Sequence, residues 1–116
     1  MRFILPFVLA FCGGTAHADW ARITDGATFT AKVVGNSYAD ANGAWFRFNS
    51  DGTLSGGASG QALTGQWEFR NGGACFNRAL GGQTLPPDCI VVFVDGNQLV
   101  TVRDAGRGRQ TVYTRQ

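Results

Sequence analysis

LTGQWEFRNGGACFNRAL, residues 63–80, contains two runs of strand-forming residues on either side of a glycine turn. In the first run, Leu63, Trp67 and Phe69 alternate with polar residues, which places them on one face of a β-strand. The Asn-Gly-Gly sequence at residues 71–73 supplies the positive φ angles that a tight hairpin requires. This stretch therefore predicts an antiparallel hairpin with one apolar face.

A second alternating run precedes it. AWFRFNS, residues 44–50, places Phe46 and Phe48 on one face of a strand and Trp45 on the other. The Asp-Gly pair at residues 51–52 then turns the chain into the next strand. Trp45 consequently faces a cavity or solvent, where it is a candidate ligand contact, although a covering helix or loop would explain it equally well.

The C-terminal half continues the pattern. CIVVFV, residues 89–94, is apolar on both faces, which is typical of a strand covered on both sides. An Asp-Gly-Asn turn at residues 95–97 leads into QLVTVRD, and QTVYTRQ at residues 110–116 ends the chain. The frequent glycines beside Asp or Asn indicate a meander of short antiparallel strands.

One helix is expected, within TDGATFTAKVVG at residues 24–35. Thr24 can cap its start, Asp25 favours the positive end of the helix dipole, and Gly35 can adopt the left-handed conformation that ends a helix. A single apolar stripe would pack this helix against the sheet: Ile23, Phe29, Val33 and Val34.

The elements together predict a mainly β fold. We expect a short N-terminal helix packed on a curled antiparallel sheet, or on a partly closed barrel, of about 7–8 strands. Closure would reduce the exposed strand edges that favour aggregation. A flatter two-layer sandwich is the alternative.

Residues 1–18 have the pattern of a secretory signal peptide: a basic residue, an apolar run and Ala-His-Ala before the cleavage point. Cleavage after Ala18 would leave a single domain, residues 19–116, in the periplasm. A buried N-terminal strand or helix is one alternative. Acylation at Cys12 is another, although the bulky Phe11 precedes it where lipoprotein signals have a small residue.

Two cysteines would remain after cleavage, Cys75 and Cys89. Zinc sites and redox pairs favour closer CxxC spacing, whereas these cysteines are separated by thirteen residues with Pro86 and Pro87 between them. In an oxidising compartment they predict a structural disulfide that closes a long Gly/Pro loop.

Several function classes are excluded by what the mature sequence would lack. The single histidine, His17, lies in the signal peptide, so no imidazole would remain for acid–base catalysis or metal binding. Ten basic residues less Arg2 leave nine against eight acidic ones, too small a difference to indicate nucleic acid or membrane partners. We therefore predict no catalytic residue, no metal, no cofactor and no transmembrane segment.

Remaining acidic residues have simpler roles. Glu68 would lie on the polar face of its strand beside Arg70, in solvent. Four aspartates lie near glycine, asparagine or proline, where turn formation explains them: Asp40, Asp51, Asp88 and Asp95.

The segment RDAGRGRQ, residues 103–110, is the one local basic cluster. Arg103, Arg107 and Arg109 could hold a carboxylate or phosphate on a loop made flexible by glycine. A solvated turn between the last two strands is the alternative.

The order of these features resembles a family of short exported proteins of alphaproteobacteria. The resemblance rests on Val-Val-Gly at 33–35, D-G-x-x-x-G at 51–56, T-G-x-W at 64–67 and the pair Cys75 and Cys89. It covers nearly all of the mature chain. Members often have Arg directly after the first cysteine, where this chain has Phe and Asn.

Members of that family often carry the label dihydrodipicolinate reductase. A nicotinamide reductase needs a G-x-G-x-x-G loop between a strand and a helix. The nearest glycine pattern, GTLSGGASG at residues 52–60, lies among hairpins, and the chain is too short for two enzyme domains. We therefore interpret the label as inherited.

Two functions remain in view. The first is a monomeric, non-enzymatic periplasmic module that binds a small apolar or amphipathic ligand or a protein partner. The alternative is a reductase, as the family label implies, or another small periplasmic enzyme.

Overall fold

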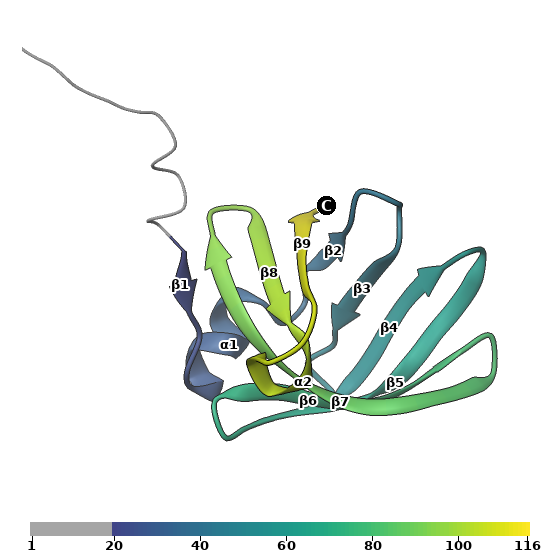
Figure 1. The fold of residues 1–116 in the computed structure, drawn as a ribbon, viewed down its shortest axis with the longest axis horizontal. Coiled ribbons are helices and arrows are strands. Elements are labelled where there is room, and N and C mark those ends of the chain that lie inside the picture. The colour runs from purple at the N-terminus through teal and green to yellow at the C-terminus, as the bar shows by residue number, and fades with distance from the viewer. Residues whose placement is uncertain (1–19) are drawn as a thin grey trace, which may run out of the picture.

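Nine strands and two short helices make up residues 20–116, the part of the chain that the computed structural model describes (Figure 1). In chain order the elements are β1 (Ala21–Arg22), α1 (Gly26–Lys32), β2 (Ser37–Ala39), β3 (Trp45–Phe48), β4 (Thr53–Ala58), β5 (Gln61–Arg70), β6 (Gly73–Leu80), β7 (Gln83–Asp95), β8 (Gln98–Val102), α2 (Arg103–Gly106) and β9 (Gln110–Arg115). Within these residues, neither helix has the length and apolar character needed to cross a membrane. The signal peptide predicted at residues 1–18 lies outside the described residues.

The strands form a closed up-and-down barrel. From β2 to β9 each strand pairs antiparallel with the next one in the chain, and pairing of β9 with β2 closes the ring. The remaining strand, β1, pairs with Phe93 and Val94 of β7, beyond the last β7 residue that pairs with β6. The predicted mainly β fold of seven to eight strands with a short helix is therefore confirmed, with eight strands in a fully closed barrel rather than a partly closed one.

Alternation along the strands sets the inner face, as the sequence pattern predicts. Phe48 and Leu54 are buried on neighbouring strands, and Leu63, Trp67 and Phe69 pack against the same core. The turns also form where expected: at the β5–β6 hairpin Asn71 and Gly72 have φ angles of 53° and 77°. Short turns of this kind let each strand pair with its neighbour in sequence, which produces the meander.

The chain between the two cysteines is not the long loop that the sequence suggested. β6 continues to Leu80, two glycines turn the chain, and β7 begins at Gln83. Pro86 and Pro87 lie within β7, where the β6–β7 register shifts. This part of β7 pairs with a strand on one side only, so the prolines remove no hydrogen bond from a second ladder.

One end of the barrel is closed by α1. Asp25, rather than Thr24, is the N-cap, and its carboxylate accepts a hydrogen bond from the Thr28 backbone N–H at 2.8 Å. Phe29 is fully buried and inserts among aromatic rings, with centroid distances of 5.0 Å to Phe69 and 5.2 Å to Phe48. Figure 1 shows the β4–β5 and β6–β7 hairpins extending away from this helix. The end of the barrel away from α1 is therefore formed by the ends of hairpins.

Candidate functional site

A cavity of about 600 Å³ occupies the end of the barrel away from α1. Its rim is formed by the β2–β3 turn, the far ends of the β4–β5 and β6–β7 hairpins, and the segment between β8 and β9. Its walls are the same strands whose other ends pack around Phe29. The cavity thus continues the barrel interior beyond the aromatic core.

Most of the lining is apolar, because alternation places aliphatic and aromatic side chains on the inner face. Phe48 and Ile90 are shared with the core and form the deep part of the cavity. The other large apolar side chains of the lining are Phe46, Leu54, Leu63, Phe76, Leu80 and Leu85.

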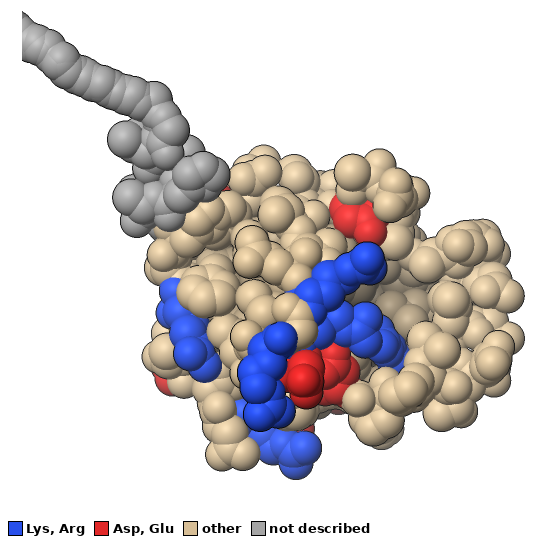
Figure 2. All heavy atoms as spheres, in the orientation of Figure 1, with Lys and Arg blue, Asp and Glu red and all other residues tan. Residues whose placement is uncertain are grey.

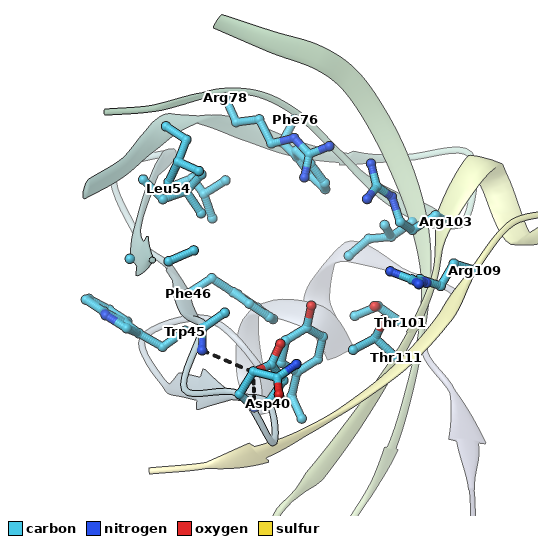
Figure 3. Close-up of a pocket in the computed structure, with 18 of the residues that line it drawn as sticks. Asp40, Trp45, Phe46, Leu54, Phe76, Arg78, Thr101, Arg103, Arg109 and Thr111 are labelled. Carbon is cyan, nitrogen blue, oxygen red and sulfur yellow. Dashed lines mark hydrogen bonds between the residues drawn. The ribbon is translucent and has the colours of Figure 1, made fainter. Parts of the chain in front are cut away.

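Polar side chains gather on one side of the cavity. Figure 3 shows Arg78, Arg103 and Arg109 on that side, with Thr101 and Thr111 beside them and Leu54 and Trp45 across the opening. Basic side chains, with acidic ones among them, likewise surround a hollow on one face of the molecule (Figure 2). The cavity therefore has an apolar side and a cationic side.

Arg78 is the most constrained of these cations. It lies on β6 opposite Gly65 of β5, and its guanidinium stands 5.4 Å from the centroid of the Phe76 ring. Its Nε atom is buried and has no hydrogen-bond partner among residues 20–116. Burial lowers the pKa of Arg78, and the positive charge of Arg103 lowers it further. An arginine in this position still carries its charge at neutral pH.

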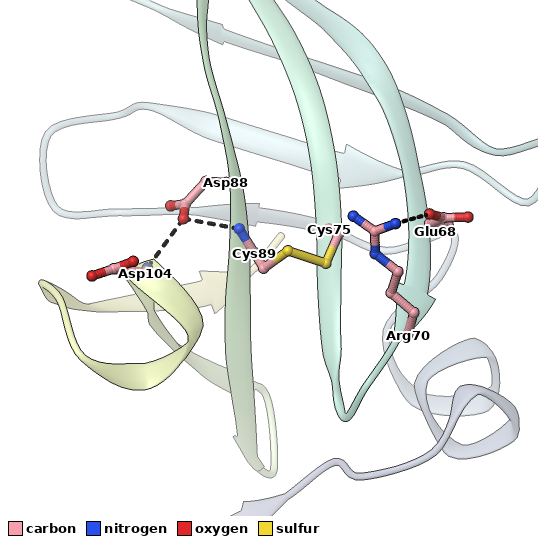
Figure 4. Close-up of a disulfide and its surroundings, with 6 residues drawn as sticks. All are labelled: Glu68, Arg70, Cys75, Asp88, Cys89 and Asp104. Carbon is pink, nitrogen blue, oxygen red and sulfur yellow. Dashed lines mark hydrogen bonds and ion pairs between the residues drawn. A yellow bond between two sulfur atoms is a disulfide. The ribbon is translucent and has the colours of Figure 1, made fainter.

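Arg103 is held by a partner. Its Nε donates to a carboxylate oxygen of Asp88 at 2.9 Å, and the Asp88 side chain is 13% exposed. The other Asp88 oxygen accepts hydrogen bonds from the backbone N–H groups of Cys89 and Asp104, at 2.8 and 3.1 Å (Figure 4). Asp88 therefore ties α2 to β7, and its assignment from sequence as a turn residue is wrong.

The remaining two arginines of the basic cluster diverge. Arg109 lines the mouth of the cavity, whereas Arg107 does not. Arg107 is exposed and lies 3.5 Å from the carboxylate of Asp104 on α2. Asp104 and Ala105 have φ angles of 54° and 55°, so this segment makes a left-handed turn. As a result, Arg103 and Arg109 line the cavity and Arg107 does not.

Trp45 lies at the rim, where its side chain is 36% exposed. Its indole crosses β4 at Gly57: a Cβ on that glycine would come within 2.9 Å of the Trp45 Nε1 atom. The indole is thus packed flat against the neighbouring strand while still lining the mouth of the cavity. Trp45 can contact a ligand that reaches the rim.

Tyr113 and Asp40 complete the polar side. The Tyr113 ring packs edge-on against Phe46 with centroids 4.8 Å apart. Burial raises the pKa of Tyr113, and the negative charge of Asp40 raises it further. The phenol therefore stays neutral and can donate a hydrogen bond. Asp40 accepts from the backbone N–H groups of Asn42 and Ala44, as predicted for a turn aspartate.

The predicted disulfide between Cys75 and Cys89 is confirmed. The two residues lie directly opposite each other on β6 and β7, and Figure 4 shows the bond bridging these strands. Neither sulfur belongs to the cavity lining. Glu68 and Arg70 form an exposed ion pair at 2.9 Å nearby, as their place on the polar face of β5 predicts. The disulfide is structural and separate from the cavity.

Arg78 was the main residue that sequence reasoning missed. The run ACFNRAL places residues 74, 76 and 78 on the same face of a strand, so continued alternation would have pointed Arg78 inward. An arginine on the inner face of a small barrel is unusual enough to mark a site.

The glycine-rich residues 52–60 have no nucleotide-binding geometry. They form β4 and the turn into β5, so no helix follows them. Within residues 20–116, no three histidine, cysteine or acidic side chains lie close enough to hold a metal ion.

No protein-family model, curated protein or solved structure matches the chain. The resemblance to a family of exported proteins accordingly stays a prediction.

Proposed function

We propose that this protein is a non-enzymatic binding module that holds one small apolar or amphipathic ligand in the open end of its barrel. The observation that carries the proposal is the cavity of about 600 Å³ above a closed aromatic core. Binding sites for small molecules typically have volumes of about 300–1,000 Å³ and mostly apolar walls with few polar groups. The volume of this cavity falls in that range, and its apolar wall faces a second wall that is more polar than in most such sites.

The packing of the strands supports a cavity rather than a loosely filled core. An eight-stranded barrel is wide enough to be filled by side chains or to hold one small ligand. Two positions on the inner face, Gly56 and Gly65, contribute no side chain. A Cβ at Gly65 would collide with the backbone oxygen of Asn77, so the close approach of the strands itself keeps this position empty.

We place the protein in the periplasm as a monomer. The signal pattern of residues 1–18 supports export. A disulfide, as formed by Cys75 and Cys89, is typical of oxidising compartments. Cell fractionation should recover a product that begins at Asp19 from the periplasm, and an uncleaved chain in the cytosol would contradict the proposal.

A protein partner is less well supported than a small ligand. Among residues 20–116 the exposed large hydrophobic side chains are Trp45 and Val112, and both line the mouth of the cavity. They form no broad apolar patch of the kind that marks a protein interface. Their position at the rim suits contact with a ligand that enters the barrel.

A neutral fluorescent probe tests the proposal directly. N-phenyl-1-naphthylamine should bind the purified protein with one-to-one stoichiometry and a rise in fluorescence. Leu63→Trp, which places an indole in the cavity, should abolish that rise. Ala62→Trp adds the same ring on the outer face of β5 and should leave it unchanged. Probe binding by Leu63→Trp, or none by the native protein, would contradict the proposal, with circular dichroism confirming that each variant folds.

The reductase alternative has its own test. NADPH should not raise the melting temperature of the protein, because the described residues contain no strand–loop–helix unit around the glycine-rich stretch. A clear NADPH-dependent rise would overturn the non-enzymatic reading.

A further inference from the structure

We infer that the ligand of this cavity is a monocarboxylate with a compact apolar body, and that Arg78 binds its carboxylate. The inference rests on the proposed function and adds the chemical class of the ligand. The first observation is that the buried Nε–H of Arg78 has no hydrogen-bond acceptor among residues 20–116.

Arg78 has an incomplete set of partners. Arg78 is half-buried, and removing part of a guanidinium from water costs free energy unless hydrogen bonds and a counter-charge compensate it. Within residues 20–116, Arg78 forms no ion pair, and its buried Nε–H has no acceptor. The ring of Phe76 compensates part of the charge from one side. An acceptor that enters the cavity would complete the set.

The other charges at the cavity leave room for one negative charge. Arg103 is already paired with Asp88, and the Asp40 carboxylate accepts hydrogen bonds within its own turn. Three arginines against these two carboxylates leave one net positive charge, shared between Arg78 and Arg109. In Figure 3 both of these guanidinium groups lie on the same side of the opening.

A carboxylate matches this arrangement better than a phosphate. The planar guanidinium presents parallel N–H donors that fit the two oxygens of a carboxylate. A phosphate monoester carries about two negative charges at neutral pH, which exceeds the single charge left over here. Tyr113, whose phenol stays neutral, and Thr111 supply further donors on the same side.

The apolar body of the ligand would face the opposite wall. Leu54 and Phe46 lie across the cavity from Arg103 and Arg109, and Trp45 stands at the rim on that side (Figure 3). Leu63 also lines the cavity. Below them the rings of Phe48 and Phe29 fill the barrel, 5.2 Å apart between centroids, and stop a long chain from entering. The space suits a medium-length alkyl chain or one to two fused rings.

A matched set of probes tests the inference: decanoate, decan-1-ol and decylammonium, each competing with bound N-phenyl-1-naphthylamine. The affinity for decanoate should exceed the affinity for decan-1-ol by about tenfold or more, because a charge-assisted hydrogen bond adds to the alkyl contact that both compounds make. Decylammonium should bind most weakly. Arg78→Met should remove most of the preference for decanoate and leave decan-1-ol within about threefold.

Arg70→Met is the control, since Arg70 is exposed on the outer face and pairs with Glu68. It should keep the native preference. Salt gives a second readout that needs no variant: between about 0.01 M and about 1 M the Debye length falls from about 30 to about 3 Å, so decanoate binding should weaken while decan-1-ol binding does not.

The outcomes separate the two proposals. Equal affinity for decanoate and decan-1-ol, or a decanoate affinity that is independent of both salt and Arg78, overturns the carboxylate assignment and leaves the binding function intact. Failure of every decyl compound and of the neutral probe to bind overturns the binding function itself.

Discussion

The two ends of this barrel are built from the same eight strands and differ in what occupies their interior. At the end near α1, Phe29 inserts between Phe48, Trp67 and Phe69, and no space remains. At the other end no helix enters the barrel, and a cavity of about 600 Å³ opens between the strands. Strand alternation determines which side chains face the barrel interior. Whether one end of that interior is a packed core or an open cavity depends on the element that covers it.

The largest expected effect separates the two ends by stability. Phe29→Ala should lower the free energy of unfolding by about 3–5 kcal/mol, because the ring is fully buried at the closed end. Phe76→Ala removes a partly buried ring that lines the cavity and should cost less, about 1–2 kcal/mol. Urea denaturation of the two variants measures the difference. Equal costs would show that the open end is packed as well as the closed one.

The disulfide should matter for stability and not for the cavity. Replacing Cys75 and Cys89 together with serine should lower the unfolding free energy by about 2–5 kcal/mol, because the bond restricts the unfolded chain. Probe binding should persist, since neither sulfur lines the cavity.

Mass spectrometry under non-reducing conditions should find the native protein two hydrogens lighter than the reduced form. A thiol reagent should react only after unfolding and reduction. Rapidly alkylated cysteines in native protein would contradict the structural role and revive a redox function.

The smallest expected effects concern the pH dependence of stability. A residue at the closed end of the barrel affects stability at acid pH, and a residue at the open end affects it at alkaline pH. Hydrogen bonds from the backbone and side chain of Thr28 lower the pKa of Asp25 at the closed end. A lowered pKa in the folded state stabilises the protein above the ordinary pKa of the carboxyl, and this contribution is lost as the pH falls through the folded value. Asp25→Asn should therefore flatten the acid side of the stability profile.

At the open end the pH dependence of stability has the opposite sign. Burial raises the pKa of Tyr113, so the neutral phenol is favoured in the folded state. Stability from this group is full below the ordinary pKa of tyrosine and declines as the pH rises toward the folded value. Tyr113→Phe should flatten the alkaline side and leave the acid side unchanged. Melting temperatures across the pH range compare both variants, and a profile in which either change affects the opposite limit would contradict this assignment.

Much of the fold was predictable because local signals agreed with the final structure. The inward side of β5, the turns at Gly52 and Gly72, and the apolar stripe of α1 all follow from periodicity and glycine placement. Closure of the barrel was harder to predict, because it depends on β2, a strand of three residues with no alternating pattern long enough to recognise. Pairing partners that distant in sequence are chosen by packing and not by local propensity.

The candidate site was predictable only in part. The sequence cluster at residues 103–110 drew attention to Arg103 and Arg109, which line the cavity, and equally to Arg107, which does not. Asp88 was predicted only to form a turn, and no role was predicted for Arg78. Their roles depend on other parts of the fold: Asp88 binds Arg103 and Asp104 of α2, and Arg78 lines the open end of the barrel. Neither relation can be seen from the flanking residues.

The pairing of β2 with β9 has a consequence for the order of folding. Every other contact around the ring joins strands that are adjacent in the chain, whereas this seam joins Tyr38 to Arg115 and Ala39 to Thr114. Bringing β2 and β9 together closes the longest loop in the barrel and therefore costs the most chain entropy. Only two residue pairs offset this cost, compared with eight between β5 and β6. The hairpins should therefore form first and the ring should close last. In native-state hydrogen exchange, the amides of β2 should exchange well before those of β5, and equal protection of both strands would contradict this order.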